Sequence, residues 1–448
     1  MQIEFEPRLA TTWKGCATFV GTATWKGCAT FAGATTWKGC ATVGNNMAKA
    51  IFFNIPTHGH INPTLPLVRE LVNQGDHITY FAGPDFAEKI RAAGASYGDY
   101  GEAYSFDQSR TVAHAVLQGS QLAAATTALL PGVLAVVEQE KPDYLLFDMS
   151  APWGSIAAQR FNIPAVASFP HLPFNWRAFF SDPRVLKKGL HSLRPGQGYY
   201  RELQQQLGQL ARTHNLRRPS EINVLSSSAD LNIVFSSRTF QHAAGSFDDS
   251  YQFIGPVINT ARPDSDWSYQ RDPRRKLIYI AVGTLYQADI TFFQHCLAAF
   301  SGGDYAVILS VGKSTDPRAL GTIPDNFHVA QFVPQLNILD QADLFITHGG
   351  LNSINEAVLA LVPMIVIPNT IEQAVNALRV EQLHGGRYLE PTAVQPRTLA
   401  ETARQVLSDA TIPAGLQNIR QSFLAAGGVP RGVQAIQALK QAHHINRP

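Results

Sequence analysis

The 448 residues, of which 45% are hydrophobic and 16% charged, are too many for one compact core and predict two domains of ordinary size. The formal net charge is +2 with no long basic or acidic block, which argues against nucleic acid or an anionic membrane as the main partner. Neither a signal peptide nor an apolar stretch of roughly 18 residues is found, so we expect no membrane span and a cytoplasmic location.

The first 46 residues contain a repeat. A motif that begins at Trp13 recurs at Trp25 and Trp37, a period of twelve residues. The tract also holds three of the four cysteines of the chain: Cys16, Cys28 and Cys40. These thiols could bind metal or form disulfides, but neither histidine nor a close CxxC pair accompanies them, as metal sites usually require. We interpret residues 1–46 as a disordered or non-native segment and place the natural start at Met47.

From Lys49 onward, apolar strand-like runs alternate with helical patterns. The runs in the first half are Ala50–Ile55, His77–Phe81, Tyr144–Phe147, Ala165–Phe169 and Asn232–Phe235. After the first run, Asn62-Pro63 has the pattern of a helix N-cap with proline at N1. The alternation predicts a parallel, doubly wound sheet, and we assign residues 47–260 to an N-terminal domain.

A polar tract, 261–275, has no apolar period and is predicted to be a linker. A second series of strands follows it: Lys276–Val282, Tyr305–Val311, His328–Val333, Leu344–Thr347 and Met364–Ile367. We assign 276–448 to a C-terminal domain whose last helix packs back on the N-terminal domain. Within it, we expect Cys296 to be a core thiol. Two Rossmann-like α/β domains would face each other across a cleft at the carboxyl edges of their sheets, where such folds bind ligands.

The joint after the strand Leu344–Thr347 is the most informative stretch. The strand brings His348 to the carboxyl edge, two glycines let a ligand approach the backbone, and a helix is predicted to begin near Asn352. Free N–H groups and a partial positive charge at that helix start suit a diphosphate. Glu356, four residues after Asn352, could accept hydrogen bonds from ribose hydroxyls. However, Ser353-x-x-Glu356 is also a capping box, and this stretch alone leaves both interpretations open.

Two neighbouring strand ends favour the ligand interpretation. Phe332-Val333, together with Gln335, provides an aromatic face and an amide on which a base could stack and form hydrogen bonds. Glu372-Gln373 provides a carboxylate and an amide suited to sugar hydroxyls.

This set resembles the C-terminal signature of family 1 glycosyltransferases, the UDP-dependent sugar transferases, from Phe332 to Gln373. The matching positions are His348, Gly349, Gly350, Asn352, Ser353, Glu356, Pro368, Glu372 and Gln373. In many plant members tryptophan stands at Phe332 and aspartate at Glu372, so this chain departs from their pattern at two positions of the donor site. The resemblance implies the GT-B fold, a UDP-sugar as donor substrate with no further cofactor, and a diphosphate contact at Gly283-Thr284.

The segment Pro56–Pro63 resembles the start of bacterial macrolide and flavonoid glucosyltransferases of the same family. The resemblance implies that His60 is the general base and that Asp148 is its partner. The chemistry agrees, because an alcohol is a poor nucleophile and an imidazole with a pKa near ~6.5 can deprotonate it at neutral pH. A carboxylate would also fix the tautomer of that imidazole.

Simpler interpretations exist for these residues. His58 and His60 could be two metal ligands, but no third ligand is found at a useful spacing. Asp148 could cap the turn after its strand. Asp264-Ser265-Asp266 has the DxD form used by metal-dependent transferases, but it lies in the predicted linker and we interpret it as a coincidence. We therefore expect no metal site.

We predict an inverting glycosyltransferase that moves a sugar, glucose by the resemblance, from a UDP-sugar to a hydroxyl of a small hydrophobic acceptor. The acceptor is expected near Phe169–Phe174 and the helical region after Ala113, although these apolar residues could equally be core. The alternatives are a nucleotide-sugar epimerase of the same architecture and a catalytically idle sugar-nucleotide binding protein. An NAD-dependent oxidoreductase is disfavoured because Pro56–Pro63 has one glycine. The acceptor and the oligomeric state are not predicted.

Overall fold

The computed structural model describes residues 47–101, 104, 115–174, 177, 180, 182–192, 198–258, 269–282, 290–312 and 315–445. The chain divides between Gly44 and Asn45, and all that follows concerns the second unit. The repeat tract, the DxD-like triplet and Gly283-Thr284 lie outside the described residues.

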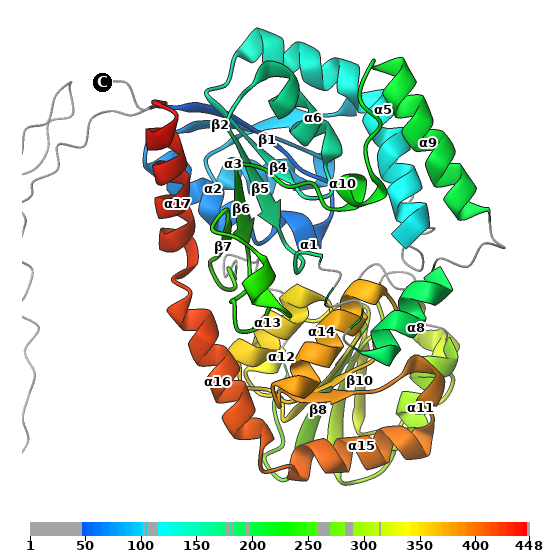
Figure 1. Ribbon diagram of the computed structural model, residues 1–448. Helices are drawn as coiled ribbons and strands as arrows, with labels where there is room; N and C mark the ends of the chain where they lie inside the picture. Colours follow the sequence, from blue (N-terminus) through cyan, green and yellow to red (C-terminus); the bar gives the residue numbers. More distant parts are fainter. Residues whose placement is uncertain are drawn as a thin grey trace, which may run out of the picture. The chain divides into compact units, whose positions relative to one another are not determined.

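The described residues form two parallel sheets, one of seven strands and one of six (Figure 1). The first comprises β1 (Lys49–Phe53), β2 (His77–Ala82), β3 (Ser96–Asp99), β4 (Tyr144–Asp148), β5 (Ala165–Phe169), β6 (Leu231–Val234) and β7 (Tyr251–Phe253). The second comprises β8 (Lys276–Ala281), β9 (Tyr305–Ser310), β10 (Phe327–Ala330), β11 (Leu344–Thr347), β12 (Met364–Val366) and β13 (Gly386–Tyr388). The strand orders are β3-β2-β1-β4-β5-β6-β7 and β10-β9-β8-β11-β12-β13. Each contains the 3-2-1-4-5-6 order of a Rossmann fold, which confirms the predicted fold class.

Every run predicted as a strand is a strand, with small differences at the ends. The sequence analysis missed β3, β7 and β13, which share one property: each lies at the edge of its sheet. An edge strand has one neighbour and need not be apolar on both faces, so its sequence lacks the continuous apolar run of a central parallel strand. The residues of β3, for example, are exposed or half-buried.

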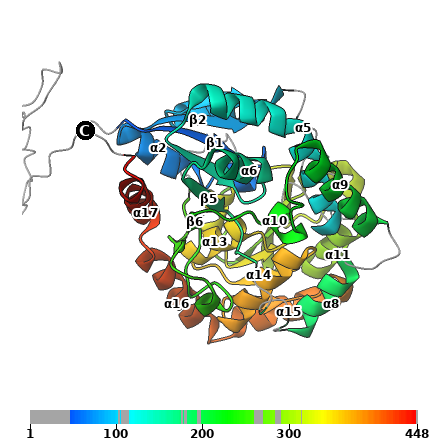
Figure 2. The same cartoon turned by 45° about the horizontal axis from the view of Figure 1, so that its top comes forward.

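Helices cover both faces of the sheets (Figure 2). In the first half they are α1 (His58–Ile61), α2 (Leu65–Asn73), α3 (Ala87–Ala92), α5 (Ala115–Glu140), α6 (Pro152–Phe161), α8 (Pro183–Ser192), α9 (Tyr199–Thr213) and α10 (Glu221–Leu225). In the second half they are α11 (Ile290–Phe300), α12 (Gln335–Leu339), α13 (Leu351–Leu359), α14 (Ile371–Gln382), α15 (Pro396–Ser408), α16 (Ile412–Ala425) and α17 (Gly428–Ala442).

Alternation along the central strands builds two cores around the first sheet. On β1, Phe52 packs in the cluster that contains α2 and α3, whereas Ile51 and Phe53 pack in the cluster that contains α5 and α6. Successive side chains of a strand point to opposite faces, so one strand contributes to both layers. The sheet is therefore buried on both faces, as the continuous apolar runs predicted.

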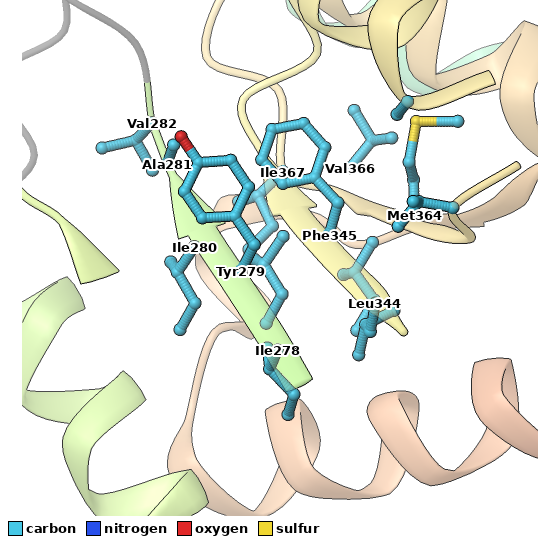
Figure 3. Close-up of a cluster of buried hydrophobic side chains, with 14 of the residues drawn as sticks. Ile278, Tyr279, Ile280, Ala281, Val282, Leu344, Phe345, Met364, Val366 and Ile367 are labelled. Carbon is cyan, nitrogen blue, oxygen red and sulfur yellow. The ribbon is translucent and has the colours of Figure 1, made fainter. Parts of the chain in front are cut away.

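The second sheet has its own core (Figure 3). Tyr279 on β8 and Phe345 on β11 stack with ring centroids 4.9 Å apart. Cys296 on α11 is fully buried in this cluster, and burial raises the pKa of its thiol, which confirms the predicted core thiol. Val185 of α8 and Phe240, which come from the first half of the chain, also pack in it.

The last helix packs on the first sheet's helices. Val433 and Ile436 of α17 join the cluster that contains α2. Lys440 Nζ lies 2.6 Å from Asp76 Oδ1, and both side chains are fully buried. Tyr144 donates a hydrogen bond to the other carboxylate oxygen of Asp76 at 2.7 Å. The end of the chain is thus fastened to the first domain by a buried ion pair as well as by apolar contacts.

Two local expectations were wrong. Residues 58–61 form the short helix α1, and the next helix begins at Leu65 with Thr64 as its N-cap, so Asn62-Pro63 does not start a helix. In addition, α5 is long and apolar enough to cross a membrane by length and composition, a stretch that the sequence analysis did not find. Half of its apolar window is buried, and it packs against α6 and α9, as a core helix does.

Candidate active site

The carboxyl edge of the first sheet carries a buried histidine–aspartate pair. Asp148 is the last residue of β4, and His60 lies on α1, which follows β1. Phe53 and Phe147 are in register, so the two chain segments leave the sheet at the same level. His60 Nδ1 is 2.9 Å from both carboxylate oxygens of Asp148, and the residues are 7% and 0% exposed. Because a carboxylate only accepts, Nδ1 donates, and Nε2 is left as the proton acceptor of the ring.

Asp148 also caps the turn that follows it. Its Oδ1 accepts a hydrogen bond from the backbone N–H of Ser150 at 2.8 Å. The two interpretations of Asp148 are therefore compatible, because a carboxylate has lone pairs enough for both donors.

A buried polar network holds α1 in position. The Asn54 amide donates to Tyr80 Oη at 2.6 Å and to the backbone carbonyl of His60 at 3.4 Å. Thr64 donates to the carbonyl of Ile61 at 2.8 Å, and its hydroxyl is also 2.8 Å from Tyr80 Oη. The sequence analysis missed this network, although the signal was present as polar residues directly after a buried strand.

His58 points to a different environment from His60. Its ring packs edge-on against Phe86, with centroids 4.9 Å apart. Within the described ranges, no group of three His, Cys, Asp or Glu side chains is arranged to hold a metal ion.

At the second sheet, the joint from β11 to α13 depends on its two glycines for packing. Gly349 has φ +89°, and a Cβ there would lie 2.5 Å from Val366 Cγ1. A Cβ on Gly350 would lie 2.7 Å from His348 Nε2. The chain can turn this tightly under the His348 ring only because both residues lack a side chain.

Of the two interpretations left open for Ser353-x-x-Glu356, the capping box is wrong. The N-cap of α13 is Gly350, and Ser353 is the third residue inside the helix. An N-cap side chain accepts from the free backbone N–H groups that follow it at the helix start. Ser353 lies inside the helix, where the next N–H, that of Ile354, already donates to the Gly350 carbonyl, so Ser353-x-x-Glu356 has no capping geometry. The N-cap Gly350 makes no side-chain hydrogen bond to this helix start, whose first N–H groups have no acceptor within the helix.

Glu356 instead pairs with an amide from the preceding strand–helix unit. Gln335 Nε2 donates to Glu356 Oε2 at 2.7 Å and lies 3.4 Å from Ser353 Oγ. Tyr279 donates to Gln335 Oε1 at 3.2 Å. The structure therefore brings together three predicted site residues, Gln335, Ser353 and Glu356, in one polar cluster.

Phe332 and Val333 lie in the loop between β10 and α12. The predicted strand His328–Val333 was too long, because β10 ends at Ala330. Phe332 is 45% exposed, which is unusual for so large an apolar side chain, whereas Val333 is half-buried.

Two asparagines connect the site to its surroundings. Asn352, one of the predicted donor-site residues, donates from Nδ2 to the carbonyl of Gly59 on α1 at 2.9 Å and so links the helix after β11 to the helix after β1. Asn376 Nδ2, which the sequence analysis missed, donates to the Gly349 carbonyl at 2.9 Å and to Glu372 Oε1 at 2.6 Å. It thereby holds both the glycine turn and a predicted sugar-binding carboxylate.

Gln373 already has a structural role. It is the N3 residue of a capping box at the start of α14: its Oε1 accepts from the backbone N–H groups of Asn369 and Thr370 at 2.8 and 3.2 Å. Thr370 Oγ1 accepts in return from the Gln373 N–H at 3.2 Å. The question of whether a residue caps a helix or binds the donor, which the sequence raised for Glu356, thus applies to Gln373.

His171 connects the base to the donor-side carboxylate. It follows β5, and its Nε2 lies 2.9 Å from His60 Nε2. Its Nδ1 makes an ion-pair contact of 3.2 Å with Glu372 Oε1. His171 belongs to the segment Phe169–Phe174 that was expected near the acceptor, but the sequence analysis assigned it no role of its own, although a histidine in the first turn after a buried strand was a signal.

The charges shift one another's ionisation. Burial lowers the pKa of His171, but the carboxylates of Glu372 and Asp148 outweigh it, and the net shift is upward. Burial raises the pKa of Glu372, but His171 and Asn376 outweigh it, and the net shift is downward. For His348, burial dominates and lowers the pKa, against the opposing effects of Glu372 and the Ala281 carbonyl. The surroundings thus favour the neutral form of His348 and the charged form of His171.

The segment expected near the acceptor is divided between core and surface. Phe169 is fully buried on β5, and Leu172 packs in the core of the second sheet. Phe174 is 42% exposed. Of these three apolar residues, Phe174 alone offers substantial area to a ligand.

Comparison with known proteins agrees with this geometry. The family described as erythromycin biosynthesis protein CIII-like, C-terminal domain, matches residues 294–439. The chain is 32% identical over 388 residues to NDP-glycosyltransferase YjiC of Bacillus subtilis (strain 168), which covers 86% of this chain and 95% of that protein. It is 31% identical over 408 residues to the uncharacterized UDP-glucosyltransferase YojK of the same organism, with coverages of 88% and 98%.

A solved structure gives the same result in three dimensions. The kitacinnamycin glycotransferase superposes with a TM-score of 0.75 at 25% identity, over 88% of this chain and 99% of that one. The similarity therefore extends over nearly the whole length of each of these proteins.

Proposed function

This chain belongs to the YjiC-like, family 1 glycosyltransferases of GT-B fold, and from that premise we propose that it transfers glucose from UDP-glucose to a hydroxyl of a small hydrophobic acceptor, with inversion at the anomeric carbon. Its relatives include the NDP-glycosyltransferase YjiC and the oleandomycin glycosyltransferase of Streptomyces antibioticus. The observation that carries the proposal is the buried His60–Asp148 pair, held at the carboxyl edge of one sheet beside the uncapped start of α13 in the other.

In the proposed reaction, His60 Nε2 takes the proton of the acceptor hydroxyl. The hydroxyl oxygen forms a bond to the anomeric carbon as the bond from that carbon to the diphosphate oxygen breaks, and UDP leaves with the electron pair. Asp148 stabilises the imidazolium that results, since it accepts from Nδ1 at 2.9 Å. General base catalysis of this kind contributes about 10²–10⁴-fold to the rate.

On the donor side, the proposal assigns each part of UDP-glucose to a group in the second domain. The N–H groups that begin α13 would stabilise the charge that develops on the diphosphate, with His348 beside them. Glu356 would hold the ribose, Phe332 the base and Glu372 the sugar hydroxyls. The N–H groups and His348 would thus stabilise the negative charge of the leaving diphosphate, which a divalent ion does in metal-dependent transferases. We therefore expect activity without added metal.

A panel of UDP- and dTDP-sugars incubated with phenolic, terpenoid and macrolide acceptors would test this function. The expected result is a glycoside detected by mass, of inverted anomeric configuration by NMR, and formed equally in excess chelator. Conversion of the donor without acceptor would favour an epimerase, and binding without any turnover would favour an idle binding protein. Loss of activity in chelator that magnesium or manganese restores would contradict the metal-independent donor site.

A further inference from the structure

Four ionisable side chains form a continuous row from the first sheet to the second. The row runs Asp148, His60, His171, Glu372, with contacts of 2.9, 2.9 and 3.2 Å between successive side chains. The inner end is closed to solvent, since Asp148 is fully buried, whereas the side chains of His171 and Glu372 are 31% and 30% exposed. The row thus begins at the proposed base pair and ends at the proposed sugar-binding carboxylate.

The contact between the two imidazoles occupies the atom that the reaction needs. His60 Nδ1 is bonded to Asp148, so Nε2 is the only ring atom left to accept a proton. That Nε2 lies 2.9 Å from His171 Nε2, a separation that requires a proton between the two nitrogens. An acceptor hydroxyl cannot donate to the same lone pair while this hydrogen bond exists.

The hydrogen bond between His60 Nε2 and His171 Nε2 depends on the number of protons that the two rings carry. His60 Nδ1 donates to Asp148, whereas His171 Nδ1 has no hydrogen-bond partner among the described residues and lies 3.2 Å from Glu372 Oε1, a carboxylate that favours a proton on this nitrogen. If both Nδ1 atoms carry a proton, one further proton between the two Nε2 atoms makes the pair a cation between two anions. When that proton leaves, two lone pairs face each other at 2.9 Å, and the contact becomes repulsive. The rings then separate, and His60 Nε2 can accept a hydrogen bond from a hydroxyl.

We propose that His171 is a positioning residue that shares one proton with His60, so that the protonated pair closes the base and the deprotonated pair opens it to the acceptor. This inference rests on the proposed function of His60 as base. In the reaction cycle, the proton taken from the acceptor returns the pair to its closed, hydrogen-bonded state as UDP leaves. The proton then passes to solvent, and the pair reopens.

The other charged groups around the pair are few among the described residues. Asp148 faces it from β4 and Glu372 from α14. His348, in the loop after β11, acts on Glu372. Tyr80 and Tyr104 lie near Asp148, and since burial raises the pKa of both phenols they stay neutral over the working range.

The proton that His60 shares with His171 determines in which direction a substitution of His171 shifts the pH dependence of the reaction. Two sites that share a hydrogen-bonded proton bind it more tightly than either does alone, so the base opens at a higher pH than an unpartnered His60–Asp148 pair would. Replacing His171 by leucine removes the second nitrogen. The acidic limb of the kcat/KM profile should then move to lower pH by about one unit, the order of one charge-assisted hydrogen bond. On the alkaline plateau kcat should fall about tenfold, because the proton on His60 loses its partner, while the donor KM stays within about twofold.

Two measurements on the full chain test the proposal. In protein labelled with ¹⁵N-histidine, a scalar coupling across the hydrogen bond should join two imidazole nitrogens at pH values below the acidic limb. It should vanish in His171→Leu and persist in the control His328→Gln, an exposed histidine on β10. The second measurement is the pH profile of kcat/KM for the wild type, His171→Leu, His171→Asn and the control.

The coupling together with a shift of the limb to lower pH in the His171 variants supports the shared proton. Absence of the coupling in the wild type at every pH overturns it, as does an unmoved limb in both variants. His171→Asn serves where the leucine variant does not fold. If no sugar is transferred by the wild type, the proposed function fails, and the coupling alone then decides whether the pair exists.

Discussion

Removing the imidazole of His60 should separate chemistry from donor binding. We expect His60→Ala to lower kcat by about 10²–10⁴-fold, the usual contribution of a general base. UDP affinity should not change, because the groups assigned to UDP belong to the second sheet and its helices. Steady-state kinetics and calorimetric titration with UDP check the two halves of this expectation. Retention of most of the turnover would remove His60 from the mechanism.

The Gln335–Glu356 pair allows the ribose assignment to be tested without loss of the fold. Glu356→Gln keeps an oxygen that can accept from Gln335 but removes the charge, and a charge-assisted bond is about twice as strong as a neutral one. We expect UDP to bind about tenfold more weakly, with little change in melting temperature. Ser353→Ala, at the weaker 3.4 Å contact, is the matched variant and should change UDP affinity less. Unchanged UDP binding in Glu356→Gln would mean that this carboxylate only orders Gln335.

At the scale of single elements, the start of α14 combines a helix cap with a predicted contact to the donor sugar, and substitutions of different residues can distinguish the two roles. Thr370 and Gln373 cap the helix together, whereas Gln373 alone is proposed to face the sugar. Each change to alanine should cost about 0.5–2 kcal/mol of stability through the lost cap. Only Gln373→Ala should also raise the donor KM. Chemical unfolding and donor kinetics on both variants check this, and equal donor KM values would leave Gln373 as a capping residue alone.

Across the whole molecule, α17 ties the end of the chain to the first domain through a buried ion pair. Lys440→Ala leaves Asp76 charged and buried with only the Tyr144 hydroxyl, so we expect a loss of about 3–5 kcal/mol in the free energy of unfolding. Urea denaturation measures this loss. Lys276→Ala is the matched control, because Lys276 pairs with Asp343 at the surface and its removal should cost far less. Similar losses in the two variants would show that burial does not distinguish the pairs.

The apolar runs predicted the central strands, whereas the resemblance to family 1 glycosyltransferases implied the His60–Asp148 pair. Central parallel strands are buried on both faces, which leaves continuous apolar runs, and their carboxyl ends meet at one edge of the sheet. Asp148 at the end of β4 and His60 on the short helix after β1 therefore come together in space. The sequence also assigned Gln335 and Glu356 to one donor site, but it did not predict the hydrogen bond between their side chains.

Two kinds of feature were decided only by the tertiary structure: the residue at which each helix begins, and the contacts between segments that are distant in the sequence. The capping box is formed by Thr370 and Gln373 and not by Ser353 and Glu356, because the N-cap of α13 is Gly350 and a cap acts only at the residue that precedes the helix. The edge strands β3, β7 and β13 lack the continuous apolar run of a central strand, because a strand with one neighbour need not be apolar on both faces. The contact of His171 with both His60 and Glu372 joins three elements that no local pattern relates. It exists only because two separately folded sheets present their carboxyl edges to each other, and sequence periodicity reports the faces of one element, not the partners it meets.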